Sequence, residues 1–271
     1  MNRKLSEINI YPVKSLGGIY LSEAEVTDRG LKYDRRWMIV DNEEKFITQR
    51  TNPELALLKT KISHNKLILS HKTKDISPLV VPINSKITET TIVNVWDDLV
   101  TALLVGKYAD EWLSDVLGSK CKMVFMPEET ERFVDNTYAS QNEIVSFADA
   151  FPFLIIGQSS LDDLNSRLKE KLPMNRFRPN LVFSEGKPFE EDNWEKFKIG
   201  DVTFEAVKPC PRCVTTTIDQ ENASKNDEPL KTLSSYRMVN NKVMFGMNLV
   251  HEGTGIIHVD DEIEVLEEKQ N

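Results

Sequence analysis

The chain has 271 residues, of which 40% are hydrophobic and 28% charged, a balance typical of a globular protein with a sizeable core. Its formal net charge of −9 argues against non-specific nucleic-acid binding, which needs a basic face. No apolar run reaches the ~18 residues of a membrane span, and the N-terminal "MNRKLSEINIYPVKS" lacks the apolar stretch of a signal peptide. We therefore expect a cytoplasmic protein that binds neither nucleic acid nor membrane.

Short strands dominate the first hundred residues. Segments rich in β-formers and bounded by turn residues occur at 5–13, 20–28, 35–41 and 65–71. Near residue 100 the pattern changes: apolar residues from Leu103 to Val116 fall at helical spacing, and Gly118 suits a C-cap. We therefore expect a strand-only subdomain over residues 1–105 and a second domain over residues 106–271.

The second half contains a polar segment, a helix and then further strands. Residues 127–143 predict a long loop, either solvated or lying over a site. A helix is predicted over 159–172, with Ser159 or Ser160 as its cap and Lys169 and Lys171 in its last turn. Strands are predicted at 178–185, 197–209, 213–219, 243–253 and 254–266, the last as a barrel-closing hairpin that turns at Asp260–Asp261. The predicted fold class is α+β, strand-dominated, with a closed or nearly closed β-barrel and few helices.

The three cysteines do not form a disulfide framework. Cys121 resembles a small apolar core residue, whereas Cys210 and Cys213 form a Cys-x-x-Cys motif within "KPCPRCVTTTID". A closed zinc site lacks a second ligand pair, and a redox couple lacks a following helix because the threonine-rich run predicts a strand. A thiolate stabilised by the neighbouring charge of Arg212, or a pair of structural cysteines, also fits. The motif alone leaves these alternatives open.

Several cations lie beside aromatic residues, prolines or turns at strand ends. Lys14 and Ser15 precede two glycines, Arg35 and Arg36 precede Trp37, and Arg176 and Arg178 lie in "NRFRPN". Lys14, one arginine of each pair and Arg212 form a candidate phosphate site, since guanidinium groups bind phosphate in a bidentate manner. The alternative is a set of unrelated, solvated cations.

The motifs "IYPVKS", "DRRWMIVD", "FITQR", "NRFRPNLVF", "GDVTFEAVKPCPRCVTTTID" and "PLKTLSSYR" follow one another in this order. The set resembles the MOSC (molybdenum cofactor sulfurase C-terminal) domain family with its N-terminal β-barrel domain. It is most similar to the branch containing the mitochondrial amidoxime-reducing component and its bacterial relatives. The resemblance extends from about Leu5 to Leu266, and it divides the chain into a MOSC N-terminal β-barrel domain over 1–105 and a MOSC domain over 106–271.

The resemblance implies a molybdenum cofactor, a pyranopterin with a terminal phosphate. It implies that Cys213 is the catalytic molybdenum ligand and that Lys14 and Ser15 contact the phosphate end. Arg35 and Arg178 match further cofactor-binding arginines, and Asp149 lies in "FADAFPFL", which matches a wall of the cofactor site. Pro211 stands where family members can carry a small polar residue, so a side-chain contact from that position is lost here. Asp219 suits either an orienting role behind the ligand or a turn cap.

The implied activity is the two-electron reduction of small N-hydroxylated molecules from N–OH to N–H. No cysteine follows Cys213, so an iron–sulfur cluster cannot be bound there and a separate electron-transfer protein is expected. The sequence also lacks the N-terminal targeting segment of mitochondrial relatives, which favours a cytoplasmic bacterial protein. One alternative is a sulfur-transfer module, in which Cys213 carries a persulfide delivered by a separate pyridoxal-phosphate-dependent desulfurase. Another is a non-catalytic cofactor-binding protein.

Overall fold

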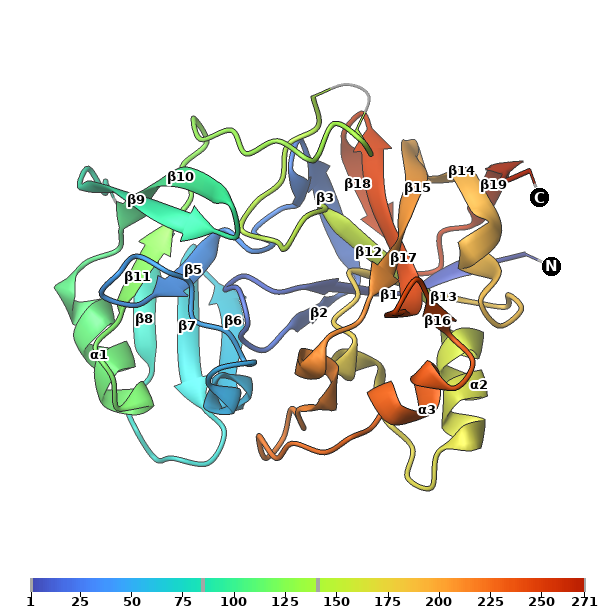
Figure 1. The fold of residues 1–271 in the computed structure, drawn as a ribbon. Coiled ribbons are helices and arrows are strands. Elements are labelled where there is room, and N and C mark those ends of the chain that lie inside the picture. Colours follow the sequence, from blue (N-terminus) through green and yellow to red (C-terminus); the bar gives the residue numbers. More distant parts are fainter. Residues whose placement is uncertain (1, 84–85, 140–141, 271) are drawn as a thin grey trace.

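The computed structural model describes residues 2–83, 86–139 and 142–270. They form two lobes that lie side by side (Figure 1). One lobe contains α1 and β5 to β11, and the other contains β1, β12 to β19, α2 and α3. Strands dominate both lobes, which confirms the predicted α+β class.

A nine-stranded sheet forms the larger lobe, in the order β19-β14-β15-β17-β12-β13-β1-β2, with β16 beside β17. Backbone hydrogen bonds from Leu5 N to Asp261 O (2.9 Å) and from Ile263 N to Arg3 O (2.8 Å) join β1 to the start of β19. These bonds close the strands into a ring around a core of aromatic and branched side chains that includes Phe197. The bounds of the strands are β1 Lys4–Ile10, β2 Ile19–Leu21, β12 Phe153–Gly157, β13 Leu181–Ser184, β14 Trp194–Ile199, β15 Val202–Pro211, β16 Met238–Val239, β17 Lys242–Glu252 and β19 Ile263–Glu268.

The predicted hairpin over 254–266 is wrong, although its turn is present. β18 (Gly255–His258) pairs with β3 (Glu23–Thr27), which also pairs with β4 (Gly30–Leu31). β19 instead pairs with β14. Asp260 has a positive φ of 73°, so the chain does turn there. A turn signal determines where the chain bends, but the partner of each strand is chosen by distant residues.

Two sheets and one helix build the smaller lobe. Their elements are β5 Trp37–Val40, β6 Leu58–Ser63, β7 Lys66–His71, β8 Leu79–Pro82, β9 Thr90–Val95, β10 Asp98–Leu104, α1 Lys107–Leu117 and β11 Lys122–Phe125. The sheets run β5-β11-β10-β9 and β6-β7-β8. The prediction of α1 is confirmed, with Gly118 as a left-handed C-cap at φ 66°. Leu103, which matched the helical spacing, belongs to β10 because Gly106 at φ 131° separates the strand from the helix.

The remaining helices pack beside the barrel. α2 spans Gln158–Arg167 and α3 spans Leu230–Ser234. The second predicted helix is therefore present but shorter, because Leu168 is extended and leaves Lys169 and Lys171 beyond its end. Neither serine forms a side-chain cap. Ser160 lies inside the helix, where its buried hydroxyl bonds to Glu191 at 2.9 Å.

Candidate functional site

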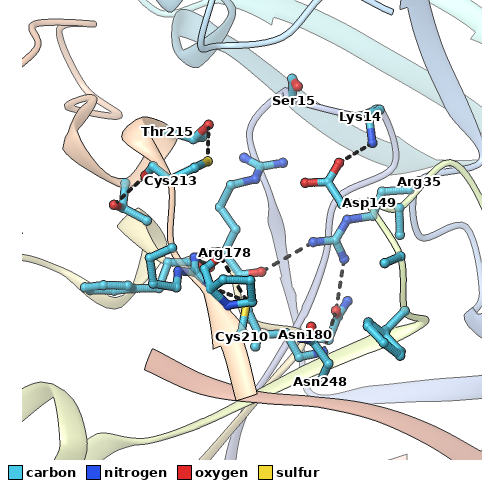
Figure 2. A pocket seen from close by; sticks show the side chains of 18 of the residues that line it. Lys14, Ser15, Arg35, Asp149, Arg178, Asn180, Cys210, Cys213, Thr215 and Asn248 are labelled. Carbon is cyan, nitrogen blue, oxygen red and sulfur yellow. Dashed lines mark hydrogen bonds and ion pairs between the residues drawn. The ribbon is translucent and has the colours of Figure 1, made fainter. Parts of the chain in front are cut away.

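A cleft lies where the segments after β1, after β5, before β12 and around β13 meet the end of β15. Figure 2 shows Cys213 and Thr215 on one side and Lys14 and Asp149 on the other, with the Arg178 side chain between them. All the side chains predicted to form the site line this one cleft: Lys14, Ser15, Arg35, Asp149, Arg178, Arg212 and Cys213. The cations are therefore gathered at one place, while their predicted roles in binding remain predictions.

Lys14, after β1, and Asp149, before β12, form an ion pair. The Lys14 ammonium donates to Asp149 Oδ1 at 2.6 Å and to the Phe147 carbonyl at 2.7 Å. Burial lowers the pKa of Lys14, although Asp149 opposes this. Desolvation of the carboxyl in the cleft would raise the pKa of Asp149. The charge and the hydrogen bond of Lys14 have the larger effect and hold that pKa well below its usual range. The Asp149 carboxyl is therefore ionised at neutral pH.

Two arginines of the site enclose the ring of Tyr11. The guanidinium carbons of Arg35 and Arg178 lie 4.4 and 4.2 Å from its centroid. Arg35 also binds Asp34 at 2.5 Å and Asn180 at 3.0 Å, while Arg178 donates to the Leu16 carbonyl at 2.7 Å. Burial lowers the pKa of Arg178 to about 10 and raises that of Tyr11 to about 12. The stack therefore holds both guanidinium groups in place without neutralising Arg178.

Cys213 presents an exposed thiol at the edge of the cleft. It donates to the Thr215 hydroxyl at 3.4 Å. The prediction of a strand over 213–219 is wrong, because Val214–Thr217 forms a short 3-10 helix. Local side-chain bonds favour this turn over a ladder: the Thr216 and Thr217 hydroxyls donate back to the carbonyls of Cys213 and Val214 at 3.0 and 2.8 Å.

The side chain of Arg212 contacts Cys210 rather than Cys213. Arg212 Nη1 donates to Cys210 Sγ at 2.9 Å, and Nη2 donates to the Phe177 carbonyl at 2.6 Å. Cys210 lies on β15, which ends at Pro211, so Cys213 lies beyond the strand. The two cysteines therefore differ: Cys210 is partly buried beside a cation, and Cys213 is exposed. Cys121 is buried, as predicted.

Arg176 was paired with Arg178 in the sequence motif but was not assigned to the site. Its side chain is 3% exposed, lines the cleft and donates to Asp219 at 2.6 Å. Among the described residues, its buried Nε and Nη1 atoms have no hydrogen-bond partner, nor has Arg212 Nε. The turn cap considered for Asp219 is confirmed, since its carboxylate accepts from the backbone N–H groups of Glu221 and Asn222, whereas its orienting role behind the ligand stays a prediction. The cleft thus contains guanidinium donors that the described protein groups do not use.

A reciprocal amide pair positions Ser15. Gln49 and Gln220 exchange hydrogen bonds at 3.2 and 2.9 Å, and Gln49 also donates to the Ser15 carbonyl at 2.7 Å. Ser15 has a positive φ of 68°, a conformation that costs about 1 kcal/mol for a residue with a side chain. The buried amides, one from each lobe, maintain this turn.

Part of the polar segment 127–143 supports the cleft. Buried Arg132 donates to the carbonyls of Ser146 at 3.0 Å, Ala148 at 2.7 Å and Asp149 at 3.1 Å. Arg132 therefore fixes the backbone that carries Asp149. Residues 140 and 141 of the predicted loop lie outside the described residues.

Within the described ranges, no three His, Cys, Asp or Glu side chains are grouped to hold a metal ion. This gives no support to the zinc alternative for the Cys-x-x-Cys motif. No helix in the described parts of the chain has the length and apolar character needed to cross a membrane.

The fold and the cleft define a two-lobed, strand-dominated protein with a cation-rich, thiol-bearing cleft. The chain belongs to the MOSC-domain family: residues 2–120 match the MOSC N-terminal beta barrel domain and residues 142–264 match the MOSC domain.

Three comparisons illustrate the relationship. The chain is 33% identical to mitochondrial amidoxime-reducing component 1 of Mus musculus, with 97% of this chain and 82% of that protein aligned. It is 32% identical to the molybdenum cofactor sulfurase of Oryza sativa subsp. japonica, with 92% of this chain but 32% of that protein aligned. The crystal structure of the YUAD protein from Bacillus subtilis covers 97% of this chain and 95% of its own, at 12% identity and a TM-score of 0.44.

Proposed function

We propose that this chain binds a molybdenum cofactor in the cleft and reduces small N-hydroxylated compounds, taking electrons from a separate protein. The observation that carries the proposal is the pairing of an exposed thiol, Cys213, with a cleft of buried cations. The relationship to proteins named amidoxime-reducing components supports the reaction class. We place the protein in the cytoplasm.

The chemistry of the cleft fits a pterin that ends in a phosphate. The unpartnered guanidinium atoms of Arg176 and Arg212 supply N–H donors that a phosphate or a pterin ring can accept, and a buried donor left without such a partner is costly. Lys14, Ser15, Arg35 and Arg178 would hold the phosphate end. The Cys213 thiolate would bind the metal, because thiolates are soft ligands suited to molybdenum.

The bound cofactor would supply two-electron chemistry, N–OH + 2 electrons + 2 protons giving N–H + water, while the protein binds and orients the reactants. Cys213 is exposed, so substrate and protons can reach that end of the cleft from solvent. Phe151 and Phe153 line the same cleft and exclude water from its apolar side. The ion pair of Lys14 with Asp149 keeps the Lys14 ammonium fixed in the cleft.

Sulfur transfer through a Cys213 persulfide is the second candidate. The exposed thiol and the relationship to a molybdenum cofactor sulfurase favour it. It requires a separate pyridoxal-phosphate-dependent desulfurase but no stoichiometric molybdenum, so the metal content distinguishes the two functions.

The test is molybdenum analysis by plasma mass spectrometry of protein from a cofactor-producing host, with Cys213→Ala and Cys210→Ala in parallel. We expect near-stoichiometric molybdenum in the wild type and in Cys210→Ala, and at least tenfold less in Cys213→Ala. Reduction of an aromatic amidoxime with an artificial electron donor should follow the metal. A metal-free wild type that carries a persulfide on Cys213 would instead establish the second candidate.

A further inference from the structure

The hairpin between β9 and β10 places a tryptophan in an unusual backbone conformation. Trp96 lies at the tip with a positive φ of 57°, where tight hairpin turns normally have Asn, Asp or Gly. A bulky residue in this region is a conformational outlier that persists only when surrounding contacts maintain it. Its side chain is nevertheless 45% exposed, so burial of the indole does not explain the choice of residue.

The contacts of Trp96 connect it to the cleft. Its ring meets Phe46 edge to face at 5.1 Å between centroids, and Phe46 in turn lies 5.0 Å from the Lys14 ammonium. The Trp96 indole also provides a hydrogen bond that stabilises the Asp149 carboxylate. The hairpin tip is thereby fastened to the ion pair of Lys14 and Asp149.

The indole also supports a cation. The guanidinium carbon of Arg50 lies 4.4 Å from the centroid of Trp96, a distance typical of a cation–π stack. Arg50 lines the cleft. An arginine stacked by its face keeps its N–H groups, which point outward in the guanidinium plane, free to bind a planar anion.

Arg50 differs from the other cleft cations in its partners. Lys14 is paired with Asp149, Arg35 with Asp34 and Arg176 with Asp219. Among the described residues, Arg50 forms neither an ion pair nor a hydrogen bond, although its charge helps to lower the pKa of Asp149. It is therefore an oriented guanidinium with unused donors, beside a half-exposed aromatic ring.

We propose that Arg50, held flat by Trp96, binds an anionic group on the substrate, a carboxylate or a phosphate, and so selects anionic N-hydroxylated compounds. This inference rests on the proposed function. Arg50 lies on the side of the cleft that carries Asp149, and its partner Trp96 is half-exposed, so it would bind an anionic group at the end of the substrate remote from the reacting N–OH. Lys14, Ser15, Arg35 and Arg178 remain for the phosphate end of the cofactor.

The experiment compares an aromatic amidoxime with the same compound bearing a ring carboxylate. Dissociation constants are measured by calorimetry, together with kcat and KM, for the wild type, Arg50→Gln and Arg50→Lys. Arg167→Gln is the matched control, because Arg167 also stacks on an aromatic ring, Tyr236, at 4.2 Å, but lies on α2 outside the cleft. The Arg167→Gln substitution removes the same charge and the same kind of stack, together with an ion pair to Asp163.

We expect the wild type to bind the carboxylate compound more tightly than the uncharged one. In Arg50→Gln the ratio of the two dissociation constants should fall about tenfold, which is the effect of losing one hydrogen bond to a charged group. The change should appear in KM rather than kcat, and Arg50→Lys should retain part of it. The Arg167→Gln control should retain the wild-type ratio of dissociation constants.

Three outcomes separate this inference from the proposed function. Equal dissociation constants for the two compounds in the wild type, or a preference kept in Arg50→Gln, would overturn the inference. Arg50-dependent binding without turnover by a metal-loaded wild type would uphold anion recognition and reject the reductase. Loss of molybdenum and pterin phosphate from Arg50→Gln, with the substrate preference retained, would assign Arg50 to the cofactor and overturn the inference.

Discussion

The ammonium of Lys14 lies 2.6 Å from the carboxylate of Asp149, yet 5% of one side chain is exposed and 69% of the other. The buried cation thus depends on a carboxylate that water also reaches. This asymmetry determines how the pair responds to mutation and to pH.

Replacing Asp149 with Asn leaves Lys14 buried with a carbonyl as its polar partner. We expect a loss of about 1 kcal/mol in the free energy of unfolding at pH 7, because water screens the exposed carboxylate. The folded-state pKa of Asp149 is lowered, so its stabilisation is complete above the unfolded pKa of ~3.9 and lost as the pH falls toward the folded value. Urea unfolding at pH 7, 5 and 3.5 should show the difference between the two proteins shrinking only at the lowest pH. A constant difference would contradict this account.

The three cysteines should react with iodoacetamide at different rates. Cys213 is exposed, Cys210 is partly buried beside Arg212, and Cys121 is buried. Burial also raises the pKa of Cys121, which lowers the fraction of reactive thiolate. Peptide mass spectrometry of briefly treated native protein should find Cys213 modified first and Cys121 last, by at least about a hundredfold. In Cys213→Ala the fast phase should vanish, and a fast phase that remained would assign it to another thiol.

Two glycines with similar backbone angles provide a matched pair. Gly246 and Gly253 have φ values of 81° and 79°, but a Cβ on Gly246 would lie 2.6 Å from Ile156 Cγ1, whereas nothing lies within 4 Å of one on Gly253. We expect Gly253→Ala to cost about 1 kcal/mol, the conformational penalty alone. Gly246→Ala should cost at least about 3 kcal/mol, because overpacking adds to that penalty. Similar costs in denaturant unfolding would show that the strand β17 can shift to make room.

Glu191 should make the protein less stable as the pH rises. Burial raises the pKa of its carboxyl to about 7, although bonds from Gly157 and Ser160 oppose the shift. Because the folded state keeps the proton longer, stability is highest below the unfolded pKa near 4.5 and decreases up to about pH 7. Relative to Glu191→Gln, the wild type should lose roughly 3 kcal/mol over this range. An unchanged difference between pH 4.5 and 7.5 would show that Glu191 is ionised throughout.

Part of the fold follows from local patterns, which is why α1, its Gly118 cap and strands such as β1, β5, β7, β13 and β17 agree with prediction, whereas β6, β8, β9, β11 and β12 were not predicted. The errors occur where side-chain hydrogen bonds or pairing with distant strands determine the local structure. The threonines after Cys213 satisfy backbone carbonyls locally and form a 3-10 turn in place of a strand. β18 and β19 take different partners despite the turn at Asp260.

The resemblance also supplied residues that lie far apart in the chain and that the fold brings together in one cleft. The sequence did not show which of two nearby cysteines the Arg212 side chain contacts. Arg212 adjoins Cys213 in sequence but contacts Cys210, and its second contact, to the Phe177 carbonyl, comes from a residue 35 positions away. Arg50 belongs to the motif "FITQR". Its proposed role depends on the stack with Trp96, and no local sequence pattern connects these two residues.

The closure of the barrel has a consequence for biosynthesis. Lys4 pairs with Ser184, and Ile263 bonds to Arg3, so β1 needs partners that lie about 180 and 260 residues further along the chain. The sheet of β5, β9, β10 and β11 needs only residues 37–125 and can form earlier on the ribosome. Non-local pairing of this kind is slow, and until it forms β1 can pair only with its neighbour β2. The residues that line the cleft extend to Asn248, so the cleft is assembled, and any ligand loaded, only after that part of the chain has been synthesised.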